Sequence, residues 1–120
     1  MSVLVDTSVW VAHFKKQNSR LIELLLGDMV LIHPFVVGEI ACGSPPNRCQ
    51  TLLDLKSLAH CKQATLEETM QMINDHQLHG VGCGLVDLSL LASALITPQC
   101  LLWTLDRRLN RLAQGFGVAF

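Results

Sequence analysis

Four acidic residues of this sequence stand in apolar surroundings, which is an unusual place for a charged side chain. Each lies within or at the end of an apolar run, and the four are Asp6, Glu39, Asp87 and Asp106. A buried ionised carboxylate is costly unless a counter-charge or a cation compensates it. Only Asp106 has close basic neighbours in the sequence, Arg107 and Arg108. The pattern therefore predicts a cation bound among the four carboxylates.

Carboxylate oxygens are preferred ligands of Mg²⁺ and Mn²⁺. A divalent cation in such a site attracts a phosphodiester and lowers the pKa of bound water, which then becomes a nucleophile. A carboxylate that does not bind the metal can serve as general base. Thr104, together with Thr7 or Ser8, is placed to hydrogen-bond the ligand carboxylates or metal-bound waters. The predicted chemistry is metal-assisted hydrolysis of a phosphodiester.

Simpler interpretations exist for several of these residues. Any single acid is commonly a helix cap, and Asp87 and Asp106 in particular fit that role. The joint occurrence of all four in apolar settings favours a site. Nearby basic residues either line a phosphate track or are ordinary solvated helix residues, and the sequence leaves both open. These basic residues are Lys15, Lys16, Arg107, Arg108 and Arg111.

The elements that must position the acids follow from the spacing of apolar residues. Short apolar runs predict buried strands at residues 2–5, 29–32 and 101–104, with a short final strand at 118–120. Helical spacing, caps and prolines predict helices at 7–14, 19–26, 34–41, 52–58, 65–73, 85–96 and 106–113. Thr7 or Ser8 is expected to cap the first helix.

Strands that alternate with helices predict an α/β fold around a mostly parallel sheet. The carboxyl ends of parallel strands meet in one crevice, where ligands bind. Asp6 and Asp106 follow such ends in the sequence.

Composition narrows the possible functions. The 120 residues predict one domain, residues 1–120, and half of them are apolar. The net charge of −1 argues against binding nucleic acid by phosphate neutralisation alone, so a local basic patch or bound cations would be needed. No apolar stretch approaches the roughly 20 residues of a membrane span, and no signal peptide is expected. We therefore expect a cytoplasmic protein.

The acids and their neighbours resemble the motifs of PIN-domain nucleases and, within them, the VapC-like toxins of bacterial toxin–antitoxin pairs. The matching segments are residues 5–10, 37–40, 84–87 and 104–109, and they extend over essentially the whole chain. The resemblance implies a three-layer α/β/α sandwich with a parallel central sheet. It also implies that Asp6, Glu39, Asp87 and Asp106 form the family's acidic, metal-binding quartet, with Thr104 as its polar companion.

The same resemblance implies an activity and partners. Such proteins use Mg²⁺ or Mn²⁺ to cut RNA, such as tRNA or ribosomal RNA, and they form homodimers. A cognate antitoxin docks at the active site. The expectation is therefore a metal-dependent endoribonuclease, and the alternative is a PIN-like module that binds RNA or protein without cutting. Residues 45–79 carry no motif of the family.

Overall fold

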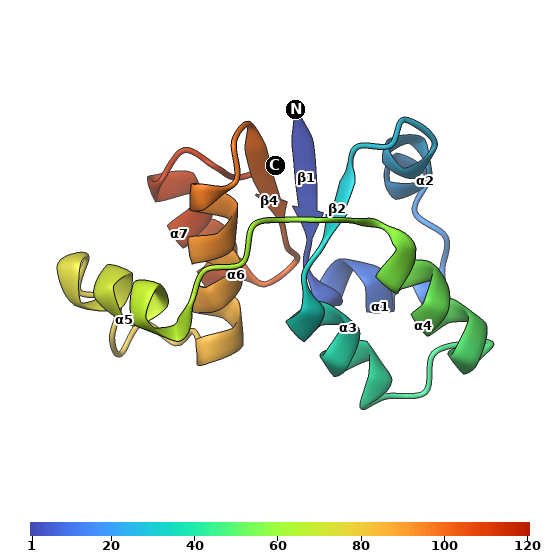
Figure 1. Ribbon diagram of the computed structural model, residues 1–120, viewed down its shortest axis with the longest axis horizontal. Helices are drawn as coiled ribbons and strands as arrows, with labels where there is room; N and C mark the ends of the chain where they lie inside the picture. Colours follow the sequence, from blue (N-terminus) through green and yellow to red (C-terminus); the bar gives the residue numbers. More distant parts are fainter.

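The computed structural model describes all 120 residues, and a sheet of four parallel strands lies at its centre (Figure 1). The strands, in the spatial order β3-β2-β1-β4, are β1 (Ser2–Val5), β2 (Val30–Ile32), β3 (Ala59–His60) and β4 (Cys100–Trp103). The apolar residues of β1 are fully buried, as expected for an interior strand that is covered on both faces. The predicted parallel α/β fold is confirmed.

Two groups of helices cover the sheet and complete three layers. Figure 1 shows α1 to α4 on one side of the strands and α5 to α7 on the other. The helices are α1 (Thr7–Lys15), α2 (Ser19–Leu26), α3 (Pro34–Ala41), α4 (Arg48–Ser57), α5 (Leu66–Asp75), α6 (Leu85–Ile96) and α7 (Arg107–Gly115). The core forms where these helices meet the strands, for example at Leu90, Leu102 and Leu109, which are completely buried. No helix is both long enough and apolar enough to span a membrane.

Strand β1 leads directly into α1, β2 into α3, and β4 into α7. Because the strands are parallel, all three connections lie at one edge of the sheet, the lower edge in Figure 1. Asp6 and Asp106 were predicted to follow the carboxyl ends of strands, and they lie at this edge.

Local signals located most elements correctly, and the exceptions are informative. The capping box of Thr65 and Glu68 is present, and α3 begins at Pro34 as predicted. The predicted final strand is wrong, because residues 118–120 contribute a single bridge between Ala119 and Leu102. The predicted cap of α1 is also wrong: Asp6 occupies the N-cap position, and the nearby hydroxyls bind carboxylates instead.

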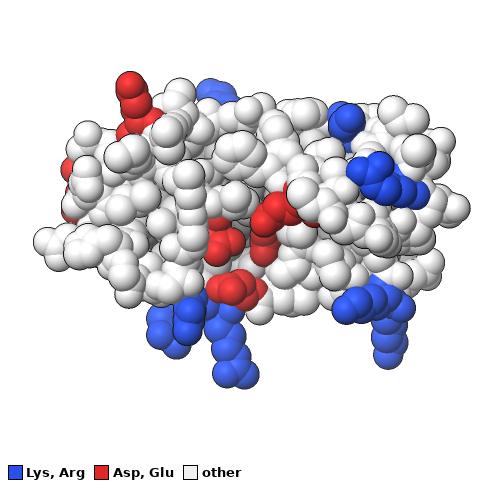
Figure 2. Space-filling model, turned by 90° about the horizontal axis from the view of Figure 1, so that it is seen from below, with Lys and Arg blue, Asp and Glu red and all other residues white.

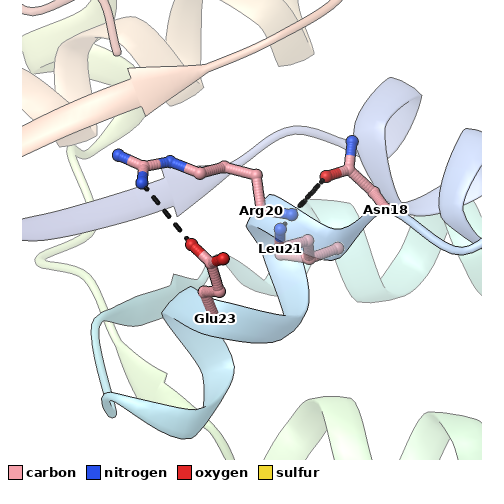
Figure 3. A network of polar contacts seen from close by, with 4 residues as sticks. All are labelled: Asn18, Arg20, Leu21 and Glu23. Atoms are coloured by element: carbon pink, nitrogen blue, oxygen red, sulfur yellow. Dashed lines mark hydrogen bonds and ion pairs between the residues drawn. The ribbon is translucent and has the colours of Figure 1, made fainter.

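Charged side chains pair with each other at only one place, on α2 (Figure 3). The side chain of Asn18 caps this helix by accepting hydrogen bonds from the backbone N–H groups of Arg20, at 3.0 Å, and Leu21, at 3.1 Å. The guanidinium of Arg20 lies 3.7 Å from the carboxylate of Glu23. Both side chains are largely exposed, so the pair contributes little stability. The structure therefore contains no ion pair that neutralises any of the four predicted site acids.

Candidate active site

The carboxylate of Asp6 is fixed by hydroxyl groups from two different connections. In the register of β1 and β4, Val5 pairs with Trp103, so the residues that follow these strands are neighbours. Asp6 Oδ2 accepts hydrogen bonds from Thr104 Oγ1 and from Ser8 Oγ, both at 2.7 Å. Asp6 is only 5% exposed, and these two donors compensate its burial.

The hydroxyls of Ser8 and Thr104 also order the turn that leads to Asp106. Ser8 Oγ accepts the backbone N–H of Leu105 at 3.0 Å, and Thr104 Oγ1 accepts that of Asp106 at 3.0 Å. Asp106 then caps α7, because its Oδ1 accepts the backbone N–H of Leu109 at 2.9 Å. Its second carboxylate oxygen accepts no hydrogen bond. Asp106 is thus both a helix cap and a potential ligand.

Glu39 lies on α3 and is oriented by α1. Thr7 Oγ1 donates to Glu39 Oε1 at 2.6 Å, and Thr7 is the residue next to Asp6. The sequence predicts that Thr7 or Ser8 hydrogen-bonds a metal-binding carboxylate or a metal-bound water. In the structure both hydroxyls bind carboxylates, Thr7 that of Glu39 and Ser8 that of Asp6.

Asp87 lies in the first turn of α6, and its only hydrogen bond is a long one of 3.4 Å from the backbone N–H of Gly84. Burial raises the pKa of Asp87 above its ordinary value, and repulsion by Asp6, Asp106 and Glu39 raises it further, whereas the Gly84 N–H acts in the opposite direction. The charges of all three other acids therefore reach this carboxylate.

Asp6, Glu39 and Asp106 lie close enough to Asp87 for their charges to act on it. Figure 2, seen from below Figure 1, shows acidic side chains around a hollow near the centre of this face, with basic side chains towards its margin. Their burial differs from the sequence-based picture of four buried acids. Asp6 alone is buried and Asp87 is half-buried, whereas Glu39 and Asp106 are exposed.

The chemistry of these donors fits a hard divalent cation. All four are carboxylates, no lysine or arginine pairs with them, and the repulsion that the other three exert on Asp87 is relieved most directly by positive charge. In the arrangement seen here, no three acidic, histidine or cysteine side chains are close enough together to hold one ion. Side chains at the hollow would have to converge on the cation.

Two features of the hollow carry no signal in the sequence pattern alone. Ser8 bridges two connections, which becomes visible only once β1 and β4 are paired. Cys83 is half-buried near the acids, where burial, followed by the charges of Asp87 and Asp106, raises the pKa of its thiol. All five cysteines are free.

A parallel sheet between two helical layers, with carboxylates beyond its carboxyl ends, is the arrangement of the PIN-domain nucleases. No family model matches the sequence. Two curated proteins do, both named Ribonuclease VapC32, from the CDC 1551 / Oshkosh and H37Rv strains of Mycobacterium tuberculosis. Each is 38% identical to this chain over 117 residues, which cover 98% of the chain and 94% of the relative. The chain therefore belongs to the VapC family of ribonucleases.

Proposed function

We propose that this protein is a divalent-metal-dependent endoribonuclease that hydrolyses RNA phosphodiester bonds and acts as the toxin of a toxin–antitoxin pair. The observation that carries the proposal is the set of four carboxylates in which the charges of Asp6, Glu39 and Asp106 act on Asp87, without any basic partner. The names of its relatives support ribonuclease as the activity.

In this proposal Asp6, Glu39, Asp87 and Asp106 hold Mg²⁺ or Mn²⁺. The ion, when bound, would polarise the phosphate to be cut and lower the pKa of a water molecule. The neighbouring hydroxyls of this chain set the positions of two of these carboxylates. Thr104 orients Asp6 by a hydrogen bond of 2.7 Å, and Thr7 orients Glu39 by one of 2.6 Å. Asp106 offers the carboxylate oxygen that does not cap α7.

The test compares cleavage of structured RNA by the wild type and by two isosteric variants, with Mg²⁺ or Mn²⁺ and with EDTA. We expect EDTA to abolish cleavage and Asp6→Asn to lower its rate by at least about a hundredfold, since even residues behind a metal ligand are worth 10- to 100-fold. The matched control is Asp28→Asn, an exposed acid in a left-handed conformation that asparagine tolerates. Equal cleavage by the wild type and Asp6→Asn would refute the mechanism.

The alternative function is a PIN-like module that binds RNA or protein without cutting, and the absence of a preformed three-residue metal cluster favours it. Titration with Mn²⁺ separates the two functions. A catalytic hollow binds Mn²⁺ and loses that binding in Asp106→Ala, whereas a binding module shows no such change.

The proposal extends to partners and location. We infer a homodimer, a cognate antitoxin that docks at the acidic hollow, a substrate of the tRNA or ribosomal RNA class, and a cytoplasmic location. The VapC name of the relatives supports the antitoxin and the RNA. Exposed apolar side chains on α5, Leu66 and Met70, offer a surface for association. Light scattering at micromolar concentration tests the dimer, and a monomer would contradict it.

A further inference from the structure

One arginine is held against the glycine-rich loop that precedes Asp87. Arg108 is the second residue of α7, and its Nη1 lies 3.5 Å from the carbonyl oxygen of Gly82, to which it donates. Gly82 has a φ of +85°, and a Cβ atom at this position would lie 2.6 Å from Cδ and 2.7 Å from Nη1 of Arg108. Glycine is therefore the residue that allows the guanidinium to lie so close to this loop.

This contact places a positive charge beside the acids without neutralising them. The charge of Arg108 acts on the Cys83 thiol, as do the charges of Asp87 and Asp106, so all three lie around the same residue. Arg108 forms no ion pair with either acid, and its side chain is exposed. One long hydrogen bond to Gly82 leaves most of the five N–H donors of the guanidinium available.

The other arginines of α7 differ from Arg108. Arg107 and Arg111 are also exposed, but neither makes a hydrogen bond or an ion pair through its side chain. Their side chains make no such contact, whereas the contact with Gly82 holds Arg108 against the loop that precedes Asp87. The three arginines thus carry the same charge, and one of them has a defined position.

We propose that Arg108 binds a phosphate of the RNA strand next to the phosphate that is cut. This inference rests on the proposed function and adds a substrate contact to it. A protein with a net charge of −1 and an acidic hollow needs a local cation to hold RNA. The planar fork of an arginine matches two phosphate oxygens at once, and a lysine has no such fork.

The test measures two quantities, the binding of a labelled pool of single-stranded RNA in EDTA over a range of KCl concentrations, and cleavage kinetics with Mg²⁺. For Arg108→Gln we expect binding about tenfold weaker, from a lost charge-assisted hydrogen bond. The slope of log Kd against log salt should decrease by about 0.7, the value for one phosphate of a single strand. KM should rise by a larger factor than kcat falls. Arg108→Lys should restore the slope and only part of the affinity.

Arg107→Gln and Arg111→Gln are the matched controls, because they remove the same charge from the same helix. A salt slope that decreases equally in all three variants would show a diffuse electrostatic effect and would overturn the proposal. An unchanged slope in Arg108→Gln would also overturn it.

Gly82→Ala supplies an independent variant. Its Cβ would displace the flexible end of Arg108, so RNA binding should weaken in the same direction. In the Arg108→Gln background the substitution should add little, which a double-mutant cycle measures. An undiminished effect in that background would contradict the contact. Circular dichroism establishes folding, and if Gly82→Ala does not fold, the comparison of the three arginines still decides.

The two proposals fail separately. If the wild type cuts RNA and Arg108→Gln leaves both KM and the salt slope unchanged, the phosphate contact is wrong and the nuclease assignment stands. If RNA is bound through Arg108 and not cut, the nuclease assignment is wrong and the contact stands.

Discussion

Asp6 and Asp87 lie at the same hollow and are held in opposite ways. Asp6 is buried and accepts two short hydrogen bonds from hydroxyls of two different connections. Asp87 is half-buried and accepts one long hydrogen bond from Gly84, at the end of a glycine-rich loop. Burial and repulsion raise the pKa of Asp87, and no hydroxyl compensates them.

This difference indicates a division of roles within the hollow. Where neighbouring elements supply donors, as at Asp6, the fold itself holds the carboxylate in place. Where they do not, as at Asp87, the charged form is unfavourable in the folded protein and gains most from a cation. Removing the charge of Asp87 and removing a hydrogen-bond donor to Asp6 should therefore change stability with opposite sign.

The largest expected effect comes from Asp87→Asn. The amide retains the shape and an acceptor for the Gly84 N–H but removes the charge that we propose binds the metal, so cleavage should decrease on the order of a hundredfold or more. At neutral pH the variant should nevertheless melt at a higher temperature than the wild type without metal, because an unfavourable negative charge is gone. Cleavage assays and thermal melts measure both.

The pH dependence of that stability difference follows from the raised pKa. A carboxyl group with a higher pKa in the folded state stabilises the fold below its ordinary pKa, and that contribution is lost as the pH rises through the raised value. The melting temperatures of the wild type and Asp87→Asn should therefore converge below the ordinary carboxyl pKa. A variant that melts lower than the wild type at neutral pH would contradict this electrostatic account.

Thr104→Val should have the next largest effect, with the opposite sign for stability. The valine cannot donate to Asp6 or accept the Asp106 N–H, which leaves a buried carboxylate short of a donor. We expect a loss of about 1–3 kcal/mol in the free energy of unfolding and a 10- to 100-fold loss of cleavage. Urea unfolding and cleavage rates measure these changes. Thr104→Ser retains the hydroxyl and should behave much like the wild type, so equal damage by both variants would argue against the hydrogen bonds.

The contrast between the two carboxylates also shows what the sequence could and could not predict. The strand at residues 2–5 and the acid that follows it are local signals, and so is Pro34 at the start of α3. Strand β3 has two exposed residues and no periodicity, and only its pairing with β2 makes it a strand.

In the same way, the roles of the hydroxyls depend on tertiary pairing. Thr7 and Ser8 stand at the start of a helical segment, where the local pattern predicts a cap. Their actual partners include Glu39, 32 residues away, and Thr104, 96 residues away. A local pattern can identify residues able to bind carboxylates, and the contact of Ser8 with Asp6 is itself local. The packing of α1 on α3 brings Thr7 to Glu39, and the register of β1 with β4 brings Thr104 to Asp6.

Thr7→Val should have the smallest effect, and it refines the comparison by adding Glu39 as a third case. Its hydrogen bond of 2.6 Å is short but lies at an exposed position, where water can replace a lost partner. We expect less than about 1 kcal/mol of destabilisation and a decrease of less than about tenfold in cleavage. The decrease should appear mainly as a higher Mn²⁺ requirement, and Thr7→Ser should restore it. If Thr7→Val instead lost as much stability as Thr104→Val, exposure would not be what distinguishes the two hydrogen bonds, and the contrast between Asp6 and Asp87 would need a different physical basis.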